Sequence, residues 1–240
     1  HDGIGVRPVE GLLQPEEVEV LVEQTLSHGG QVSYRLNPDQ TRSVYELNIT
    51  LYDWLNDPAD LHLERDVQRF LASQAIMLSL RGVPGIYFPS LFGMSNCHTC
   101  VAETGRARSI NREKYRVERL ETELSDEGSR AGRVFRAYRG LLEARAHCPA
   151  FHPAGRQSVL LMGHKEVFGL VRHSPDGNET VVCLVNASEQ TQTVQVPVGR
   201  AGVPAAERWR DLVCGEMYWA EAGALTVEMA PYGYHWLAAR

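Results

Sequence analysis

The sequence has 240 residues, with 24 Lys and Arg against 30 Asp and Glu, which gives a formal net charge of −6. Apolar residues make up 43% and charged residues 22%, as in ordinary folded proteins. The basic residues are scattered, which argues against a nucleic-acid-binding face, and no apolar run approaches the roughly 18 residues of a membrane span. We therefore expect a protein with neither a nucleic-acid partner nor a membrane partner.

The first helix is predicted in "LLQPEEVEVLVEQTLSHGG". Pro15 suits the first position of a helix, and the two glutamates after it place negative charge at the positive end of the helix dipole. Gly29 and Gly30 end the helix. A polar loop follows, with turn-forming residues at Asn37-Pro38-Asp39.

A second helix is predicted in "NDPADLHLERDVQRFLASQAIMLSLRG", with Asp57 as its N-cap, Pro58 as its first residue and Gly82 as its end. The next residues, 83–88, are an apolar run bounded by Pro and Gly. Such a run predicts a strand that is buried on both faces, as in a parallel sheet. A helix, a tight turn and a buried strand form half of a βαβ unit, so this region is expected to be α/β.

Two more helices and a β-rich tail complete the chain. "NREKYRVERLETEL" predicts a charged, solvated helix and "AGRVFRAYRGLLEARAHCPAF" an amphipathic one. From "SVLLMG" onward, short β-rich runs separated by turns predict a small antiparallel sandwich. The predicted domain boundary lies near residue 154.

Several motifs in this order carry a family resemblance. The chain starts with His1-Asp2, continues to "GVPGIY" at 82–87 and reaches "AFHP" at 150–153 before the β-rich tail. This order resembles the C-terminal half of an enzyme of the α-amylase superfamily, glycoside hydrolase family 13. The stretches "HDGIGVRPVEGLL", "VYELNITLYD" and "GRARSINREKY" are similar to the sucrose phosphorylase-like group of glucoside phosphorylases.

The resemblance implies an α/β fold class with two parts. Residues 1–153 would be the C-terminal fragment of a (β/α)8 TIM barrel, from the end of strand seven through helix eight. Residues 154–240 would be the small antiparallel β-sandwich that follows the barrel. Active sites of such barrels lie at the C-terminal ends of the strands, so residues at the end of strand seven are placed for chemistry.

By this resemblance, Asp2 is a catalytic carboxylate that stabilises the transition state, and His1 binds a sugar hydroxyl. An oxocarbenium-like transition state develops positive charge, which a fixed carboxylate stabilises relative to the neutral ground state. Arg108 or Arg112 would bind the far side of the glucosyl unit, since a guanidinium can hold a hydroxyl and a carboxylate together. The alternative is that both arginines are ordinary surface residues.

Tyr45 and Glu46 are implied to lie on a mobile loop that lines the acceptor side of the site. Familiar sucrose phosphorylases have Tyr-Gln there. A carboxylate accepts hydrogen bonds but donates none, so fructose is a doubtful acceptor and glycerate- or glycerol-type acceptors fit better. Arg35 or Arg42 would then meet an acid or a phosphate. Alternatively, Glu46 is a solvated strand residue.

The implied activity is that of a retaining α-glucoside phosphorylase with no metal or organic cofactor. It transfers a glucosyl unit between a small-molecule α-glucoside and inorganic phosphate through a covalent glucosyl-enzyme, giving α-glucose 1-phosphate. In this family the nucleophile and the acid/base residue come from strands four and five, and this sequence holds neither. We therefore expect a fragment that is inactive alone, of a parent whose oligomeric state is open.

Two alternatives stay open. The first is a fragment of an α-glucosidase- or amylase-type hydrolase or of a transglucosylase, which would use water or another sugar instead of phosphate. The second is a stand-alone, non-catalytic piece that binds glycans.

Two other features have competing interpretations. "CHTC" at 97–100 lacks a second pair of zinc ligands, so we expect an ordinary loop, and the five cysteines are expected to be reduced thiols of a cytoplasmic protein. The aromatic residues of the tail are expected to pack in a core and at interfaces rather than to form a sugar-binding platform. They are Trp209, Trp219, Tyr232, Tyr234 and Trp236.

Overall fold

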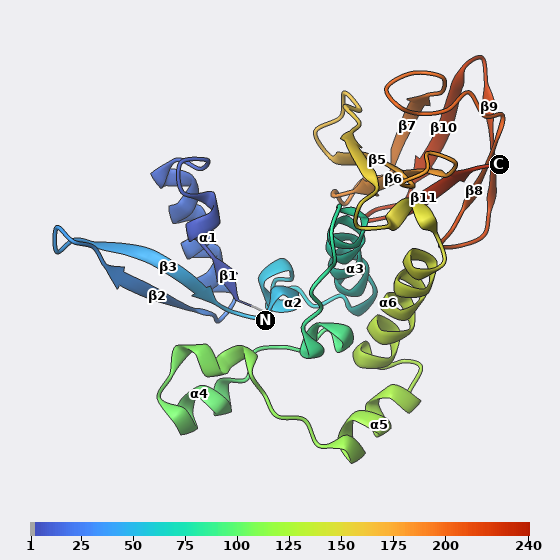
Figure 1. Cartoon of the computed structure of the whole chain (residues 1–240). Coiled ribbons are helices and arrows are strands. Elements are labelled where there is room, and N and C mark those ends of the chain that lie inside the picture. The colour runs from blue at the N-terminus through green and yellow to red at the C-terminus, as the bar shows by residue number, and fades with distance from the viewer. Residues whose placement is uncertain (1–2) are drawn as a thin grey trace. The chain divides into compact units, whose positions relative to one another are not determined.

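The computed structural model describes residues 3–240 and divides them into two compact units (Figure 1). The first unit comprises residues 3–70 together with Ile86–Phe135, and the second comprises Leu71–Gly85 and Arg136–Arg240. His1 and Asp2, the predicted sugar-binding and catalytic residues, lie outside the described part of the chain. The domain boundary predicted near residue 154 stays a prediction.

The first unit contains a three-stranded antiparallel sheet in the order β1-β3-β2. Its strands are β1 (Ile4–Gly5), β2 (Gln31–Leu36) and β3 (Arg42–Asn48). The predicted polar loop is the turn between β2 and β3, where the Asp39 carboxylate accepts a hydrogen bond from the backbone N–H of Thr41 at 3.0 Å. The turn residues were therefore recognised from the sequence, but the hairpin around them was not.

The first predicted helix is confirmed as α1 (Pro15–Ser27), which begins at proline with a capping box that links Gln14 and Glu17. The second prediction needs a correction. A short helix, α2 (Leu51–Leu55), comes first, and the long helix α3 (Leu63–Ser79) begins five residues after Pro58.

The residues between α2 and α3 explain the late start. The Asp57 carboxylate accepts from the backbone N–H of Ala59 at 2.8 Å, which closes a local turn instead of capping a helix. The Asp66 carboxylate, inside the first turn of α3, accepts from the N–H of His62 at 3.0 Å. A buried residue of the helix therefore satisfies the free N–H at its start.

The predicted strand at residues 83–88 is wrong for this structure. These residues are irregular, and Phe88 already belongs to the 3₁₀ turn η2 (Phe88–Phe92). Val83 is 82% exposed. A strand needs neighbours to receive its backbone hydrogen bonds, and no strand of the described residues pairs with this run. The apolar pattern predicted a buried strand, but a pattern within one segment does not show whether a neighbouring strand pairs with it.

Three more helices follow in the chain. They are α4 (His98–Thr104), α5 (Val117–Ser125) and α6 (Arg130–Ala146). The charged helix is therefore shorter than its sequence pattern, whereas the amphipathic one is confirmed. The side chains of Val134, Tyr138 and Leu141 on the predicted apolar stripe of α6 are fully buried.

The second unit is dominated by a curled antiparallel sheet of eight strands, which confirms the predicted β-rich tail (Figure 1). Its strand order is β4-β5-β6-β11-β8-β9-β10-β7. One apolar core joins residues from both halves of the strand order, including Val171 on β5 and Val194 on β7. The strands are β4 (Arg156–Val159), β5 (Val167–His173), β6 (Thr180–Asn186), β7 (Gln192–Pro197), β8 (Arg208–Asp211), β9 (Met217–Glu221), β10 (Ala224–Met229) and β11 (Tyr234–Ala239).

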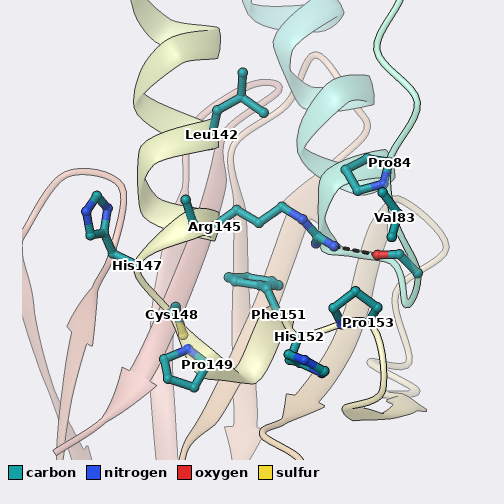
Figure 2. A pocket seen from close by; sticks show the side chains of 12 residues that line it. Val83, Pro84, Leu142, Arg145, His147, Cys148, Pro149, Phe151, His152 and Pro153 are labelled. Carbon is teal, nitrogen blue, oxygen red and sulfur yellow. Dashed lines mark hydrogen bonds between the residues drawn. The ribbon is translucent and has the colours of Figure 1, made fainter.

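Two arginines hold the C-terminal end of α3 within the second unit. Arg145 donates to the carbonyl oxygens of Leu78 and Gly82, the second contact being drawn in Figure 2. Arg172 is fully buried and donates to the carbonyl oxygen of Ser79 at 2.8 Å. Burial lowers the pKa of both guanidinium groups. The two cations compensate carbonyl groups at the negative end of the helix dipole.

Candidate functional site

Three segments that are far apart in the sequence meet in the first unit. Gly5 of β1 pairs with Glu46 of β3, so the chain that follows His1-Asp2 runs beside the strand of Tyr45 and Glu46. Gly3 has a φ of +103°, and a Cβ there would lie 3.1 Å from Glu46 Oε1 and 3.1 Å from Asn111 Nδ2. A larger residue at this position would push against both side chains.

Glu46 forms an ion pair with Arg108. The Arg108 Nε lies 3.0 Å from Glu46 Oε2, and its second nitrogen donates to Oε1 at 3.1 Å. The Glu46 side chain is 6% exposed and that of Arg108 is 45% exposed. A carboxylate this deeply buried needs a charged or hydrogen-bonding partner, whereas the guanidinium has a face open to solvent. The pair thus places a buried carboxylate next to a half-exposed cation.

Arg108 is positioned by a short 3₁₀ turn, η3 (Ala107–Asn111). Ile110 is fully buried, and its carbonyl oxygen accepts from the N–H of Cys97 at 2.7 Å. The Tyr87 hydroxyl donates to the Asn111 carbonyl oxygen at 3.0 Å. These contacts fix the C-terminal end of the turn, and Arg108 within it reaches Glu46 on β3.

The other predicted site residues occupy different environments. Tyr45 and Glu46 belong to β3 rather than to a loop, and Glu46 is buried rather than solvated. Tyr45 is 44% exposed. Arg112 is exposed, and within residues 3–240 its side chain has no hydrogen bond or ion pair. The structure therefore pairs Glu46 with Arg108, and Arg112 takes no part in that ion pair.

The two arginines considered for an acidic acceptor also differ. Arg35 pairs with Glu10 at 2.8 Å and donates to Ser43 at 3.0 Å, so its guanidinium is already used. Arg42 is exposed at the first residue of β3.

Asn111, which was not singled out from the sequence, lies beside Gly3 with Glu46. No local pattern points to it, because the contact depends on three separate segments.

The expectation of five reduced thiols is wrong for one pair. Cys97 and Cys100 form a disulfide with a Cα–Cα distance of 5.3 Å, and Cys97 is the N-cap of α4 rather than part of an ordinary loop. Cys148 and Cys183 are buried free thiols, and Cys214 is an exposed one. Burial raises the pKa of all three thiols, to about 11 for Cys214.

The aromatic side chains of the tail behave mainly as core residues. Trp209 and Trp236 are fully buried and Tyr232 is 7% exposed, whereas Trp219 on β9 is 59% exposed.

A cavity of about 690 Å³ in the second unit lies between residues 82–84 and residues 142–153 (Figure 2). Its lining is mainly apolar, with Arg145 among its polar groups, and it contains none of the predicted site residues.

Comparison with known proteins supports the sequence resemblance. Residues 157–236 match the family described as Maltogenic Amylase, C-terminal domain. The chain is 43% identical over 195 residues to a glucosylglycerate phosphorylase of Allomeiothermus silvanus, covering 81% of this chain and 34% of the relative. It is 39% identical over 244 residues to a glucosylglycerate phosphorylase of Spirochaeta thermophila, covering 99% of this chain and 40% of the relative. The chain thus spans two fifths or less of these relatives.

A solved structure shows the same fold. The sucrose 6F-phosphate phosphorylase of Thermoanaerobacter thermosaccharolyticum superposes with a TM-score of 0.62 at 22% identity, over 81% of this chain and 37% of that chain. The chain therefore has the fold and sequence of the C-terminal region of glycoside hydrolase family 13 enzymes. Its relatives in that family include glucosylglycerate phosphorylases and a sucrose phosphorylase.

None of the helices in residues 3–240 has the length and apolar character needed to cross a membrane.

Proposed function

We propose that this chain forms the acceptor side of a retaining α-glucoside phosphorylase. The observation that carries the proposal is the buried Glu46 carboxylate, held by Arg108 next to Gly3 and Gly5. Asp2 directly precedes Gly3 in the sequence, so a transition-state-stabilising role for Asp2 would put the acceptor site and the chemistry close together. The names of the most similar relatives support glycerate as the acceptor.

The chemistry of the pair suits a small hydroxy acid. The Glu46 carboxylate would accept hydrogen bonds from acceptor hydroxyl groups, and the positive charge of the half-exposed Arg108 guanidinium would attract the acceptor carboxylate. Fructose has hydroxyl groups but no carboxylate, so it would gain less from the positive charge of Arg108. The same positive charge would attract phosphate when the acceptor has left, which fits reversible transfer between an acceptor and phosphate.

The reaction needs residues that this chain does not provide. A retaining mechanism uses two carboxyl groups about 5–5.5 Å apart, one as nucleophile and one as acid/base. We assign these groups to the part of the enzyme that lies outside this sequence, as the coverage of the relatives supports. His1 would bind a glucosyl hydroxyl, and Arg112 its far side. The 240-residue chain alone is then expected to release no α-glucose 1-phosphate.

The test uses the complete enzyme that carries this sequence, with glucosylglycerate as substrate. Release of α-glucose 1-phosphate that depends on added phosphate is the expected result. Release of glucose at the same rate without phosphate would favour the hydrolase alternative and overturn the proposal. Binding of glycans by the 240-residue chain, with no phosphorolysis by the complete enzyme, would favour the non-catalytic alternative.

The variant Glu46→Gln tests the acceptor assignment. It restores the Tyr-Gln of familiar sucrose phosphorylases, so the ratio of kcat/KM for glycerate to that for fructose should fall by at least about tenfold, roughly one good hydrogen bond. Glu23→Gln, at an exposed position of α1, is the matched control and should leave the ratio unchanged. An unchanged ratio in Glu46→Gln would remove Glu46 from the acceptor site.

A further inference from the structure

The "CHTC" segment of the first unit is chemically distinct from the other cysteines. Cys97 and Cys100 are separated by two residues and joined by a disulfide, whereas Cys148, Cys183 and Cys214 are free. Cys97 is 7% exposed, and Cys100 is partly exposed. An external thiol therefore has better access to the sulfur of Cys100 than to that of Cys97.

The surroundings of Cys97 suit it as the leaving thiolate. The backbone N–H of Cys100 donates to Cys97 Sγ at 3.2 Å, and the Thr99 hydroxyl lies 3.4 Å from the same sulfur. Both groups can donate to a negative charge on that sulfur. Stabilising a thiolate lowers its pKa, and a leaving thiol of lower pKa departs faster in thiol–disulfide exchange.

We propose that Cys97–Cys100 is a reversible dithiol–disulfide site whose partner is a protein dithiol. One thiolate of the partner attacks Cys100 Sγ, the bond between Cys100 and Cys97 breaks, and Cys97 leaves as a thiolate. The second thiolate of the partner then attacks the partner sulfur of this mixed disulfide and releases Cys100. Two electrons and two protons pass to Cys97 and Cys100, and the partner dithiol becomes a disulfide.

Reducing the disulfide affects the contact between α4 and η3, the turn that contains Arg108. The N–H of Cys97 donates to the Ile110 carbonyl oxygen at 2.7 Å, and the Thr104 hydroxyl donates to Ser109 at 2.7 Å. The helix between Cys97 and η3 has seven residues, too few to be stable without support. The oxidised form therefore fixes the first turn of α4, whose Cys97 N–H binds η3, and the reduced form lets this segment open more often.

The first measurement is the redox state of each cysteine in the purified chain. The protein is equilibrated in buffers of reduced and oxidised dithiothreitol, free thiols are alkylated under denaturing conditions, and the peptides are mapped by mass spectrometry. Cys97 and Cys100 should be protected together in the oxidising buffers and alkylated together in the reducing ones. Alkylation of both thiols in every buffer would overturn the proposal.

The second measurement is hydrogen exchange in the peptide that covers residues 97–111. The chain-entropy estimate for closing so small a loop gives about 20-fold faster opening once the disulfide is reduced. Cys97→Ser/Cys100→Ser should show the same fast exchange in both buffers, because serine keeps a capping oxygen and removes only the covalent link. Cys214→Ser, which removes the exposed thiol, is the control and should behave as the wild type.

Equal exchange in the oxidised chain, the reduced chain and the double serine variant would refute the conformational part of the proposal. Neither readout uses phosphorolysis, so a negative result here leaves the proposed function untouched. A failure of the proposed function likewise leaves this site testable.

Discussion

Replacement of Arg108 by methionine should destabilise the first unit by leaving a buried carboxylate without its charged partner. Breaking a fully buried ion pair by removing one partner costs about 3–5 kcal/mol. The Glu46 side chain is 6% exposed, but that of Arg108 is 45% exposed, so water already reaches part of the pair. Discounting for this exposure, we expect Arg108→Met to lower the free energy of opening of β3 by about 2 kcal/mol.

Native-state hydrogen exchange measures this loss within β3 itself. A change of about 2 kcal/mol corresponds to roughly 30-fold faster exchange of the β3 amides. Arg106→Met, at an exposed position before η3, is the matched control and should change the rate by less than about twofold. Adding Glu46→Gln to Arg108→Met should recover about half of the loss, since a neutral amide is less costly to bury than an unpaired carboxylate.

Two results would refute this reasoning. If Arg108→Met and Arg106→Met exchanged at the same rate, the ion pair would contribute nothing to the stability of β3. If the effects of Glu46→Gln and Arg108→Met simply added, the two side chains would not be coupled, because residues in one ion pair should deviate from additivity by about 1–2 kcal/mol.

Three predictions concern the second unit, and urea unfolding at equilibrium checks each of them. Arg172→Met should cost about 2–3 kcal/mol, because the buried Ser79 carbonyl loses its side-chain donor and the His152 carbonyl loses one of its donors; an unchanged midpoint would contradict this. Burial, and next the charge of Arg156, lower the pKa of His173 below its ordinary 6.5. The folded state therefore favours neutral His173. The contribution of His173 to the free energy of unfolding should be fully present above pH 6.5 and should be lost as the pH falls below 6.5, where His173 of the unfolded chain takes up a proton; His173→Gln should flatten the pH dependence in this range. Trp236→Ala should cost about 3–5 kcal/mol and Trp219→Ala less than about 0.5, because only the first empties a core position; similar losses would contradict the assigned burial.

The sequence predicted the elements that depend on local physics. Pro15 and the glutamates after it identified the start of α1, and the apolar stripe of α6 identified its buried face. The β-rich runs recognised in the tail, at 158–163, 166–173, 180–188, 191–198, 225–230 and 232–239, overlap six strands of the second unit, but β8 and β9 lie outside them. Their short segments around Trp209 and Trp219 carry too little alternation to be recognised without their neighbours.

Contacts between distant segments were decided only by the tertiary structure. Glu46 and Arg108 are 62 residues apart, and nothing in either local pattern shows that one holds the other. The apolar run at 83–88 has the composition of a buried strand, yet it is irregular here because no described strand supplies its hydrogen bonds. Local sequence thus fixed propensity, caps and turns, whereas burial, strand pairing and the environment of the site residues depend on which distant residues the fold brings into contact.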